Sequence, residues 1–190
     1  MIILNKLTNI KSGIKVIGWD DGPFRINEDR KTVLIGAITR GGDYLEGIEK
    51  TDILVDGKDA TFKIIEATRK SKHFEQLRAI LLDGITYGGF NVVDIKELNC
   101  ETKLPVIVVS RNKTDFEALK TALKNLPDFE SRWKIIEKAG KQERPEGLSL
   151  YLQESGIRLS KVKELVELTA THSNIPEPLR LANLISSKMR

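Results

Sequence analysis

Two aspartates stand where apolar, strand-like segments of the chain end. Asp20 closes IKVIGWD and Asp83 closes LRAILLD. A carboxylate at the end of a buried strand is costly unless it is paired or binds a cation, and carboxylate oxygens are the ligands that Mg²⁺ and Mn²⁺ prefer. The simpler alternative for each is a turn residue, because a glycine follows each within two residues. Metal-assisted chemistry is predicted only if the fold brings both carboxylates to one place.

Two other positions could complete such a site. Asp59 lies in VDGKDAT, at the junction of the third expected strand and the first expected helix, where it could cap the helix or extend over the strand ends as a third carboxylate. Asp56, in the same stretch, is interpreted as a turn residue before Gly57. Arg111 follows the apolar run LPVIVVS, and its guanidinium could hold a phosphate through paired hydrogen bonds or simply lie in solvent. These residues are the candidates for binding a metal ion and a phosphate.

Hydrophobic periodicity predicts the elements that would position these side chains. Strands are expected over 14–20, 31–40 and 44–55, helices and strands then alternate over 59–72, 77–83, 88–98, 104–110 and 114–125, two strands are expected around 133–138 and 148–152, and two C-terminal helices over 159–169 and 178–189.

The resulting order, β-β-β-α-β-α-β-α with C-terminal helices, predicts an α/β fold with a ribonuclease-H-like mixed sheet in a single domain, 1–190. In that architecture the first strand lies centrally, beside the strand that follows the first helix. Ligands of such sheets bind at the carboxyl ends of the strands. Asp20 and Asp83 are therefore expected on neighbouring strands, at the same edge.

Composition excludes several classes of protein. The chain has 190 residues, 40% of them hydrophobic and 31% charged, which suits one folded domain with its own core. No apolar run approaches the roughly 18 residues of a membrane span, and no secretion signal precedes the first strand. The single cysteine, Cys100, permits neither an internal disulfide nor a cysteine-based zinc site. A cytoplasmic protein without a membrane partner is therefore expected.

Charge and the remaining motifs leave nucleic acid as an open class of partner. The 31 basic residues exceed the 27 acidic ones, and the whole excess lies in 101–190. Such a basic half is compatible with nucleic-acid binding and is also common in soluble enzymes. No serine, cysteine or histidine has the setting of a catalytic nucleophile or base, and YGGF and RGGD match no complete nucleotide-binding loop. Enzymes with a nucleotide cofactor are therefore disfavoured.

Five stretches of the chain together resemble one family. IGWDDGPF (17–24), VDGKDAT (55–61), LLDGITYGGFNVVDI (81–95) and LPVIVVSR (104–111) are similar to the archaeal endonuclease dU family, and IPEPLRLAN (175–183) is similar to the closing signature of the wider endonuclease V superfamily. The resemblance covers essentially the whole chain. It implies a metal-dependent endonuclease that cleaves a phosphodiester in DNA containing a deaminated base, deoxyuridine above all, with Mg²⁺ or Mn²⁺ as cofactor.

The resemblance also implies roles for particular residues. Asp20, Asp59 and Asp83 match the acidic residues that bind the metal, with Asp59 in place of a longer glutamate. Arg111 matches a lysine, and Asn183 falls where the superfamily signature ends in histidine. Because asparagine is neither an acid nor a base, the resemblance implies a water activated by the metal as the nucleophile.

The residues that would contact the nucleic acid are less closely matched. The stretch EGIEKTDILVDG lacks the Pro-Tyr wedge of endonuclease V, so inosine specificity is not implied. Tyr87 and Phe24 are the aromatic residues that could stack on a base, and core packing is the alternative for both. Arg111, Arg180 and Asn183 are the other expected nucleic-acid contacts.

The basic second half, with Arg158, Lys161 and Lys163, is expected to line the duplex, which predicts affinity that falls with salt. Alternative functions are a nuclease on RNA, inosine-containing or branched nucleic acid, and a catalytically silent nucleic-acid-binding protein of the same fold. Three oxygen ligands around one metal would favour an enzyme, and carboxylates neutralised by arginine or lysine would favour the silent protein.

Overall fold

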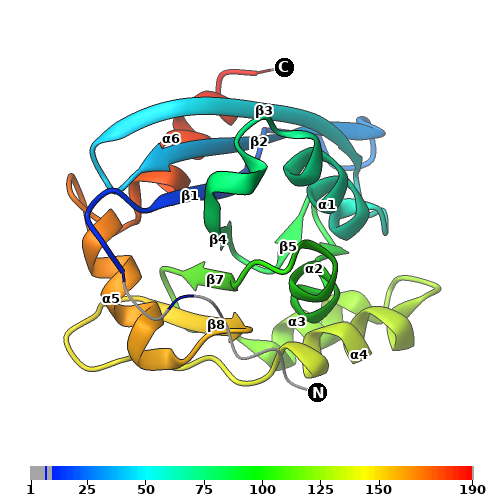
Figure 1. Ribbon diagram of the computed structural model, residues 1–190. Coiled ribbons are helices and arrows are strands. Elements are labelled where there is room, and N and C mark those ends of the chain that lie inside the picture. Colours follow the sequence, from blue (N-terminus) through cyan, green and yellow to red (C-terminus); the bar gives the residue numbers. More distant parts are fainter. Residues whose placement is uncertain (1–6, 8–9, 190) are drawn as a thin grey trace.

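The computed structural model describes residue 7 and residues 10–189. Its centre is a six-stranded sheet with the order β3-β2-β1-β4-β7-β8 (Figure 1). The strands are β1 (Lys15–Asp21), β2 (Lys31–Arg40), β3 (Tyr44–Leu54), β4 (Leu77–Asp83), β7 (Val106–Ser110) and β8 (Tyr151–Ser155). β1 pairs antiparallel with β2 and parallel with β4, β4 pairs parallel with β7, and β8 returns antiparallel beside β7. The predicted mixed sheet, with the first strand beside the strand after the first helix, is confirmed.

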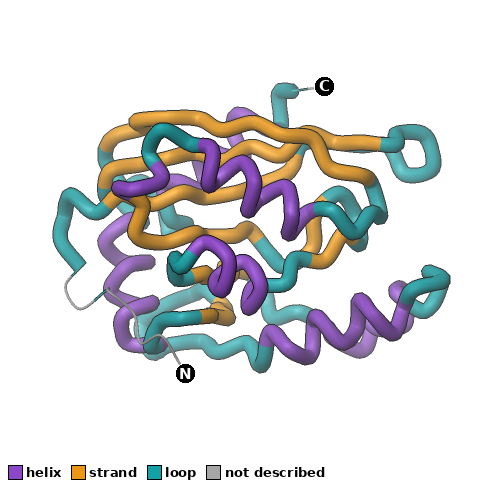
Figure 2. Tube along the Cα trace, turned by 45° about the vertical axis from the view of Figure 1, so that its right-hand side comes forward, coloured by secondary structure: helices purple, strands orange, loops and turns teal. Residues whose placement is uncertain are grey.

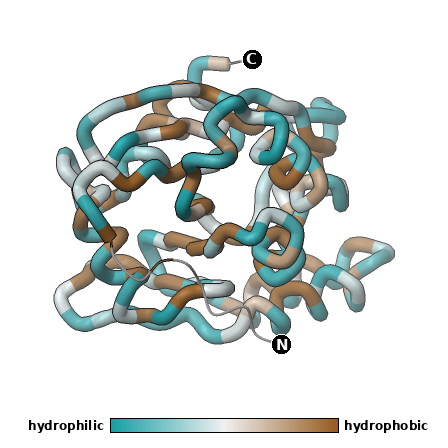
Figure 3. Tube along the Cα trace, viewed as in Figure 1, coloured by the Kyte–Doolittle hydropathy of each residue, from teal (hydrophilic) through white to brown (hydrophobic). Residues whose placement is uncertain are grey.

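Helices cover both faces of this sheet (Figures 1 and 2). One face carries α1 (Ala60–Lys70), α2 (Ile95–Thr102), α3 (Phe116–Leu123) and α4 (Phe129–Ala139). The other face carries α5 (Leu159–Thr169) and α6 (Glu177–Ser186). A short 3₁₀ turn (Phe74–Gln76) precedes β4. Side chains alternate between the faces, so Trp19 and Leu82 pack with the first group whereas Val16 and Leu81 pack with α5 and α6. Figure 3 shows β7 as hydrophobic, as a strand covered on both faces must be. Among the described residues, no helix is long and apolar enough to cross a membrane.

A small hairpin, β5 (Thr86–Tyr87) and β6 (Asn91–Val92), stands between β4 and α2. A helix was expected from residue 88, but Gly88 and Gly89 have φ of +49° and +88°, and this left-handed pair makes a turn instead. α2 begins only at Ile95, where the Asp94 carboxylate accepts hydrogen bonds from the first-turn amides.

The segment between β7 and β8 differs most from the prediction. The strand expected around 133–138 is wrong, because α4 spans Phe129–Ala139. A short apolar run such as WKIIEK fits either element, and only its packing decides. The strand expected around 148–152 lies slightly later, as β8, and α3 is capped by Asp115 rather than Thr114.

Candidate active site

Asp20 is a buried carboxylate at the carboxyl end of β1. It is 6% exposed and points to the face that carries α6, where Nδ2 of Asn183 donates to its Oδ2 at 2.8 Å. The pKa of Asp20 is raised to about 7: burial is the main cause, the Asn183 amide opposes it, and the charges of Asp83 and Asp21 add to the rise. Asn183 therefore orients Asp20 and favours its ionised form.

Asp83 lies beside Asp20 on the neighbouring strand. Trp19 pairs with Leu82 in the parallel register of β1 and β4, so the next residue of each strand is an aspartate. Arg111, just after β7, binds Asp83 with both nitrogens, Nη1 to Oδ1 at 3.2 Å and Nη2 to Oδ2 at 3.1 Å. Burial raises the pKa of Asp83, and the Arg111 guanidinium offsets part of that rise. The predicted meeting of Asp20, Asp83 and Arg111 at one sheet edge is thus observed.

Asp21 is a third acidic residue at this edge of the sheet. Because strand side chains alternate, it points away from Asp20, toward the hairpin, and accepts a 2.6 Å hydrogen bond from the Gly88 amide. Burial raises the pKa of Asp21, and the charge of Asp83 adds to the rise. The signal in the sequence was the pair of consecutive aspartates, which must place one carboxylate on each face of the sheet.

Asp59 lies at the start of α1, whereas Asp20 and Asp83 lie at the carboxyl ends of β1 and β4. It occupies the N-cap position of α1 without a capping hydrogen bond, and its Oδ1 accepts from the Leu54 amide at 3.1 Å and from Nδ2 of Asn91 at 2.7 Å. Across residue 7 and residues 10–189, no three carboxylate, histidine or cysteine side chains are grouped closely enough to hold a metal ion. Metal binding by Asp59 together with Asp20 and Asp83 stays a prediction.

A buried arginine holds that loop in place. Arg132 of α4 is 5% exposed and donates to the carbonyls of Asp56 and Gly57, each at 2.7 Å, and to the carbonyl of Phe90. Its Nε also binds Oδ1 of Asp128 at 2.8 Å, and this bond is the main reason that the pKa of Asp128 falls to about 2. Nothing in the sequence distinguishes Arg132 from a surface arginine, because its partners are backbone carbonyls far away in the chain.

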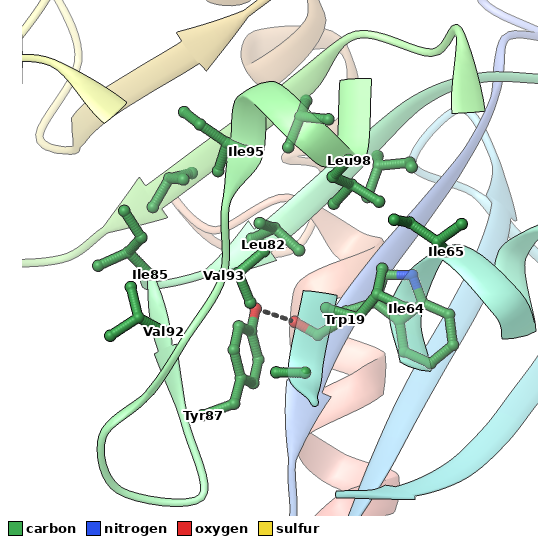
Figure 4. Packing of buried hydrophobic residues seen from close by; sticks show 14 of the residues in the cluster. Trp19, Ile64, Ile65, Leu82, Ile85, Tyr87, Val92, Val93, Ile95 and Leu98 are labelled. Carbon is green, nitrogen blue, oxygen red and sulfur yellow. Dashed lines mark hydrogen bonds between the residues drawn. The ribbon is translucent and has the colours of Figure 1, made fainter. Parts of the chain in front are cut away.

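Two of the expected nucleic-acid contacts are engaged inside the protein. Tyr87 is fully buried and its hydroxyl donates to the Trp19 carbonyl at 3.1 Å (Figure 4), so its ring is a packing residue and offers no face to a base. Arg180 binds both carboxylate oxygens of Glu177 at 2.7 Å, and Glu177 is itself 3% exposed. The buried ring of Tyr87 cannot contact nucleic acid in this conformation, whereas Arg180 is 35% exposed and binds Glu177 through Nε and Nη2 alone.

The chemistry of the Asp20–Asp83 pair suits a divalent cation. Both groups are hard oxygen donors, burial disfavours the ionised form of each, and the charge of Asp83 further disfavours ionisation of Asp20. Within the described residues no cationic side chain binds Asp20, whereas Asp83 has Arg111. A cation shared by the two carboxylates would therefore relieve a repulsion that the protein alone leaves in place.

Comparisons with known proteins identify the relatives of this chain. The family model described as "Endonuclease dU" matches residues 12–190. A UPF0215 protein from Methanosarcina barkeri is 50% identical over 181 residues, covering 94% of this chain and 92% of that protein. The crystal structure of a protein of unknown function from Archaeoglobus fulgidus is 43% identical with a TM-score of 0.84, covering 90% of this chain and 95% of that one.

A more distant solved structure has the same fold. Ciona intestinalis endonuclease V, crystallised with DNA containing an inosine, is 17% identical with a TM-score of 0.57, covering 90% of this chain and 84% of that one. This likeness confirms the predicted ribonuclease-H-like, endonuclease V-like architecture. Together the family model and the relatives identify the class of the protein: the chain belongs to the endonuclease dU family.

Proposed function

We propose that this member of a nuclease family is a metal-dependent endonuclease that cleaves DNA containing deoxyuridine. The observation that carries the proposal is the buried pair Asp20–Asp83 at the carboxyl ends of β1 and β4. A carboxylate whose pKa is raised to about 7 is costly to keep without a cation, and such groups concentrate at functional sites. DNA and deoxyuridine come from the family resemblance and await a direct test.

Asp20 and Asp83 are the residues that would hold the metal. When bound, a divalent cation supplies Lewis-acid stabilisation of the phosphate and lowers the pKa of water. Asn183 fixes the Asp20 carboxylate through the 2.8 Å hydrogen bond. Arg111 can turn from Asp83 to a non-bridging phosphate oxygen, because its side chain is half exposed while that of Asp83 is not.

Neither histidine of the chain lies at this site, so no imidazole is there to accept a proton from water. Asn183 can donate a hydrogen bond but cannot accept a proton from water. The pKa of Asp20 is raised to about 7, so its carboxylate oxygens can gain or lose a proton near neutral pH when no cation is bound. Uracil suits extrusion from the duplex because a mispaired base costs less to unstack.

The proposal is tested by nicking of end-labelled duplexes that carry one deoxyuridine, one deoxyinosine or only normal bases, with and without Mg²⁺. Asp20→Ala and Asp83→Ala are assayed beside the native protein. Nicking confined to the deoxyuridine duplex and lost in both variants is the expected result. Nicking that survives in both variants, or that requires no divalent cation, would refute the proposed site.

One observation favours a second candidate, a catalytically silent nucleic-acid-binding protein. Arg111 neutralises Asp83 through one hydrogen bond, from Nη1 to Oδ1, and a second ion-pair contact, between Nη2 and Oδ2 at 3.1 Å. If native protein binds DNA but leaves all three duplexes, RNA and branched DNA intact with either Mg²⁺ or Mn²⁺, the silent function replaces the enzyme.

A further inference from the structure

A groove lies beside the turn that follows the candidate site. A hollow of about 630 Å³ is bounded by Phe24, Arg25, Lys31, Lys50, Asp52 and Met189, among others. A second hollow of about 420 Å³ shares Lys31, Lys50 and Asp52 with it and reaches Asp59 and Lys63. We call the two together the β2–β3 groove, since both strands form its floor.

The floor of this groove is firmly built. The Gly22 amide donates to the Val33 carbonyl at 2.8 Å, and Oγ1 of Thr32 donates to the Gly22 carbonyl at 2.9 Å. These bonds extend the β1–β2 pairing past Asp21. A ligand would therefore find the groove already formed.

Two lysines of the groove have no acidic partner. Lys31 and Lys50 are exposed, and no carboxylate of the described residues lies within ion-pair distance of either. Arg25, in contrast, is bound by Glu28 and Asp29. The two hollows are also lined by the carboxylates Asp29, Asp52 and Asp59, against the four cations Arg25, Lys31, Lys50 and Lys63. The groove therefore carries one positive charge in excess.

The groove lies at the same end of β1 as the candidate site, because Lys31 begins β2 and Leu34 of β2 pairs with Asp21. Pro23 and Phe24, on its wall, follow Asp20 within four residues of chain. α6 carries Asn183 at the site and Met189, just beyond the helix, at the groove.

The lysines of α5, which the sequence favoured as a lining for the duplex, lie differently. β8 runs antiparallel to β7, so α5 begins at the edge of the sheet opposite to Asp20 and Asp83. Lys161 binds Glu164 at 2.6 Å and Lys163 lies 3.7 Å from Glu167, so both charges are already matched.

We propose that the β2–β3 groove binds the sugar–phosphate backbone of the substrate strand next to the scissile phosphate. Lys31 and Lys50 contact the phosphates, and the half-buried ring of Phe24 faces a flanking base, a role that Tyr87 cannot take because it is buried. This inference rests on the proposed function, because it assumes that a nucleic-acid strand lies across the candidate site.

The test measures binding separately from cleavage. Affinity for a fluorescein-labelled duplex with one deoxyuridine is followed by anisotropy in EDTA over a range of salt, for native protein, K31Q/K50Q and the charge-matched control K161Q/K163Q. K31Q/K50Q should lose about tenfold in affinity and reduce the slope of log K against log salt by about 2, one for each phosphate contact. D52N should change affinity in the opposite direction, by about twofold, because it removes an opposing charge.

The outcomes separate this inference from the proposed function. Equal affinity and salt slope for K31Q/K50Q and K161Q/K163Q, in a native protein that nicks normally, would overturn the groove alone. A native protein that binds DNA through Lys31 and Lys50 but never nicks would overturn the enzyme and leave the groove. Absence of any binding by native protein would overturn both.

Discussion

A charged side chain is buried near each end of β1, and the two side chains differ in the charge of the groups that bind them. Lys15, at the start of the strand, is 8% exposed and is held by Glu46 and by Oε1 of Gln76 at 2.6 Å. Asp20, near its end, is 6% exposed and has only a neutral amide from Asn183 among side-chain partners, with two other aspartates nearby.

The consequences for ionisation differ accordingly. Hydrogen bonding by Lys15 lowers the pKa of Glu46, whereas burial raises that of Asp20 to about 7. A buried charge with an ionic partner is part of the scaffold, and a buried charge among like charges is a site prepared for a ligand. Variants at the two ends of β1 should therefore differ in their effects on nicking and on the free energy of unfolding.

The largest effect is expected from Asp20→Asn. This change keeps the shape of the side chain but removes the charge that would bind the cation. Nicking of the deoxyuridine duplex should fall by at least about a thousandfold, which corresponds to roughly 4 kcal/mol of transition-state stabilisation. Single-turnover rates with Mg²⁺ measure this loss. Lys15→Met, at the opposite end, should leave the rate of the folded protein nearly unchanged, and an equal loss there would contradict the distinction.

Stability should depend on pH through Asp20, with a sign opposite to that of an ordinary salt-bridged carboxylate. The folded state retains the Asp20 proton up to about pH 7, whereas the unfolded chain loses it near the ordinary pKa of 3.8. The stability that this proton confers is complete below that lower pKa and is lost as pH rises to about 7, by up to about 4 kcal/mol.

Urea unfolding of native protein and Asp20→Asn across this range, in EDTA, measures the effect. The variant should be the more stable protein above pH 6, and its curve should be flatter. The raised pKa values of Asp21 and Asp83 have the same sign and will leave a residual slope. A native protein that gains stability between pH 5 and 7 relative to the variant would contradict the raised pKa.

Lys15→Met tests the scaffold end directly. The change leaves Glu46 with only Arg40 and leaves the Gln76 oxygen unpaired. The melting temperature should fall by about 5 °C, because removing one partner of a buried ion pair costs more than the pair contributes. Replacing both partners, Lys15→Met with Glu46→Leu, should recover part of that loss, and a double variant no better than the single one would argue against a coupled pair.

Asn183 offers a smaller change at the functional end. Asn183→Ala removes the hydrogen bond that opposes the rise in the pKa of Asp20, so the pH dependence of nicking should move to higher pH and the rate at neutral pH should fall about tenfold. Asn183→His restores the residue of the endonuclease V signature and serves as the matched comparison. An unchanged pH profile in Asn183→Ala would show that this amide does not tune Asp20.

The smallest effect is expected from Tyr87→Phe. This change removes only the hydrogen bond to the Trp19 carbonyl, so the free energy of unfolding should fall by about 1 kcal/mol. DNA affinity should stay the same, because the ring remains buried, pointing from the hairpin toward Trp19 (Figure 4). A marked loss of affinity at unchanged stability would instead return Tyr87 to base stacking.

The strands that position the candidate site, and the carboxylates at their ends, could be predicted from the amino-acid sequence. Alternating or continuous apolar residues placed β1, β2, β4 and β7, and the order of elements required β1 and β4 to be neighbours. Asp20, Asp83 and Arg111 could therefore be predicted to meet, because a parallel register carries residues at strand ends to the same edge.

The hydrogen-bond partners of buried polar groups could not be predicted from the sequence and follow from the tertiary structure. The bonds of Asp59 to Asn91, of Asp21 to Gly88 and of Arg132 to three carbonyls join segments remote in the chain, and none has a local signature. The helical state of 129–139 was settled in the same way, by packing against the sheet. Local periodicity reports which face of an element is buried, whereas hydrogen-bond partners depend on distances that exist only after the chain has folded.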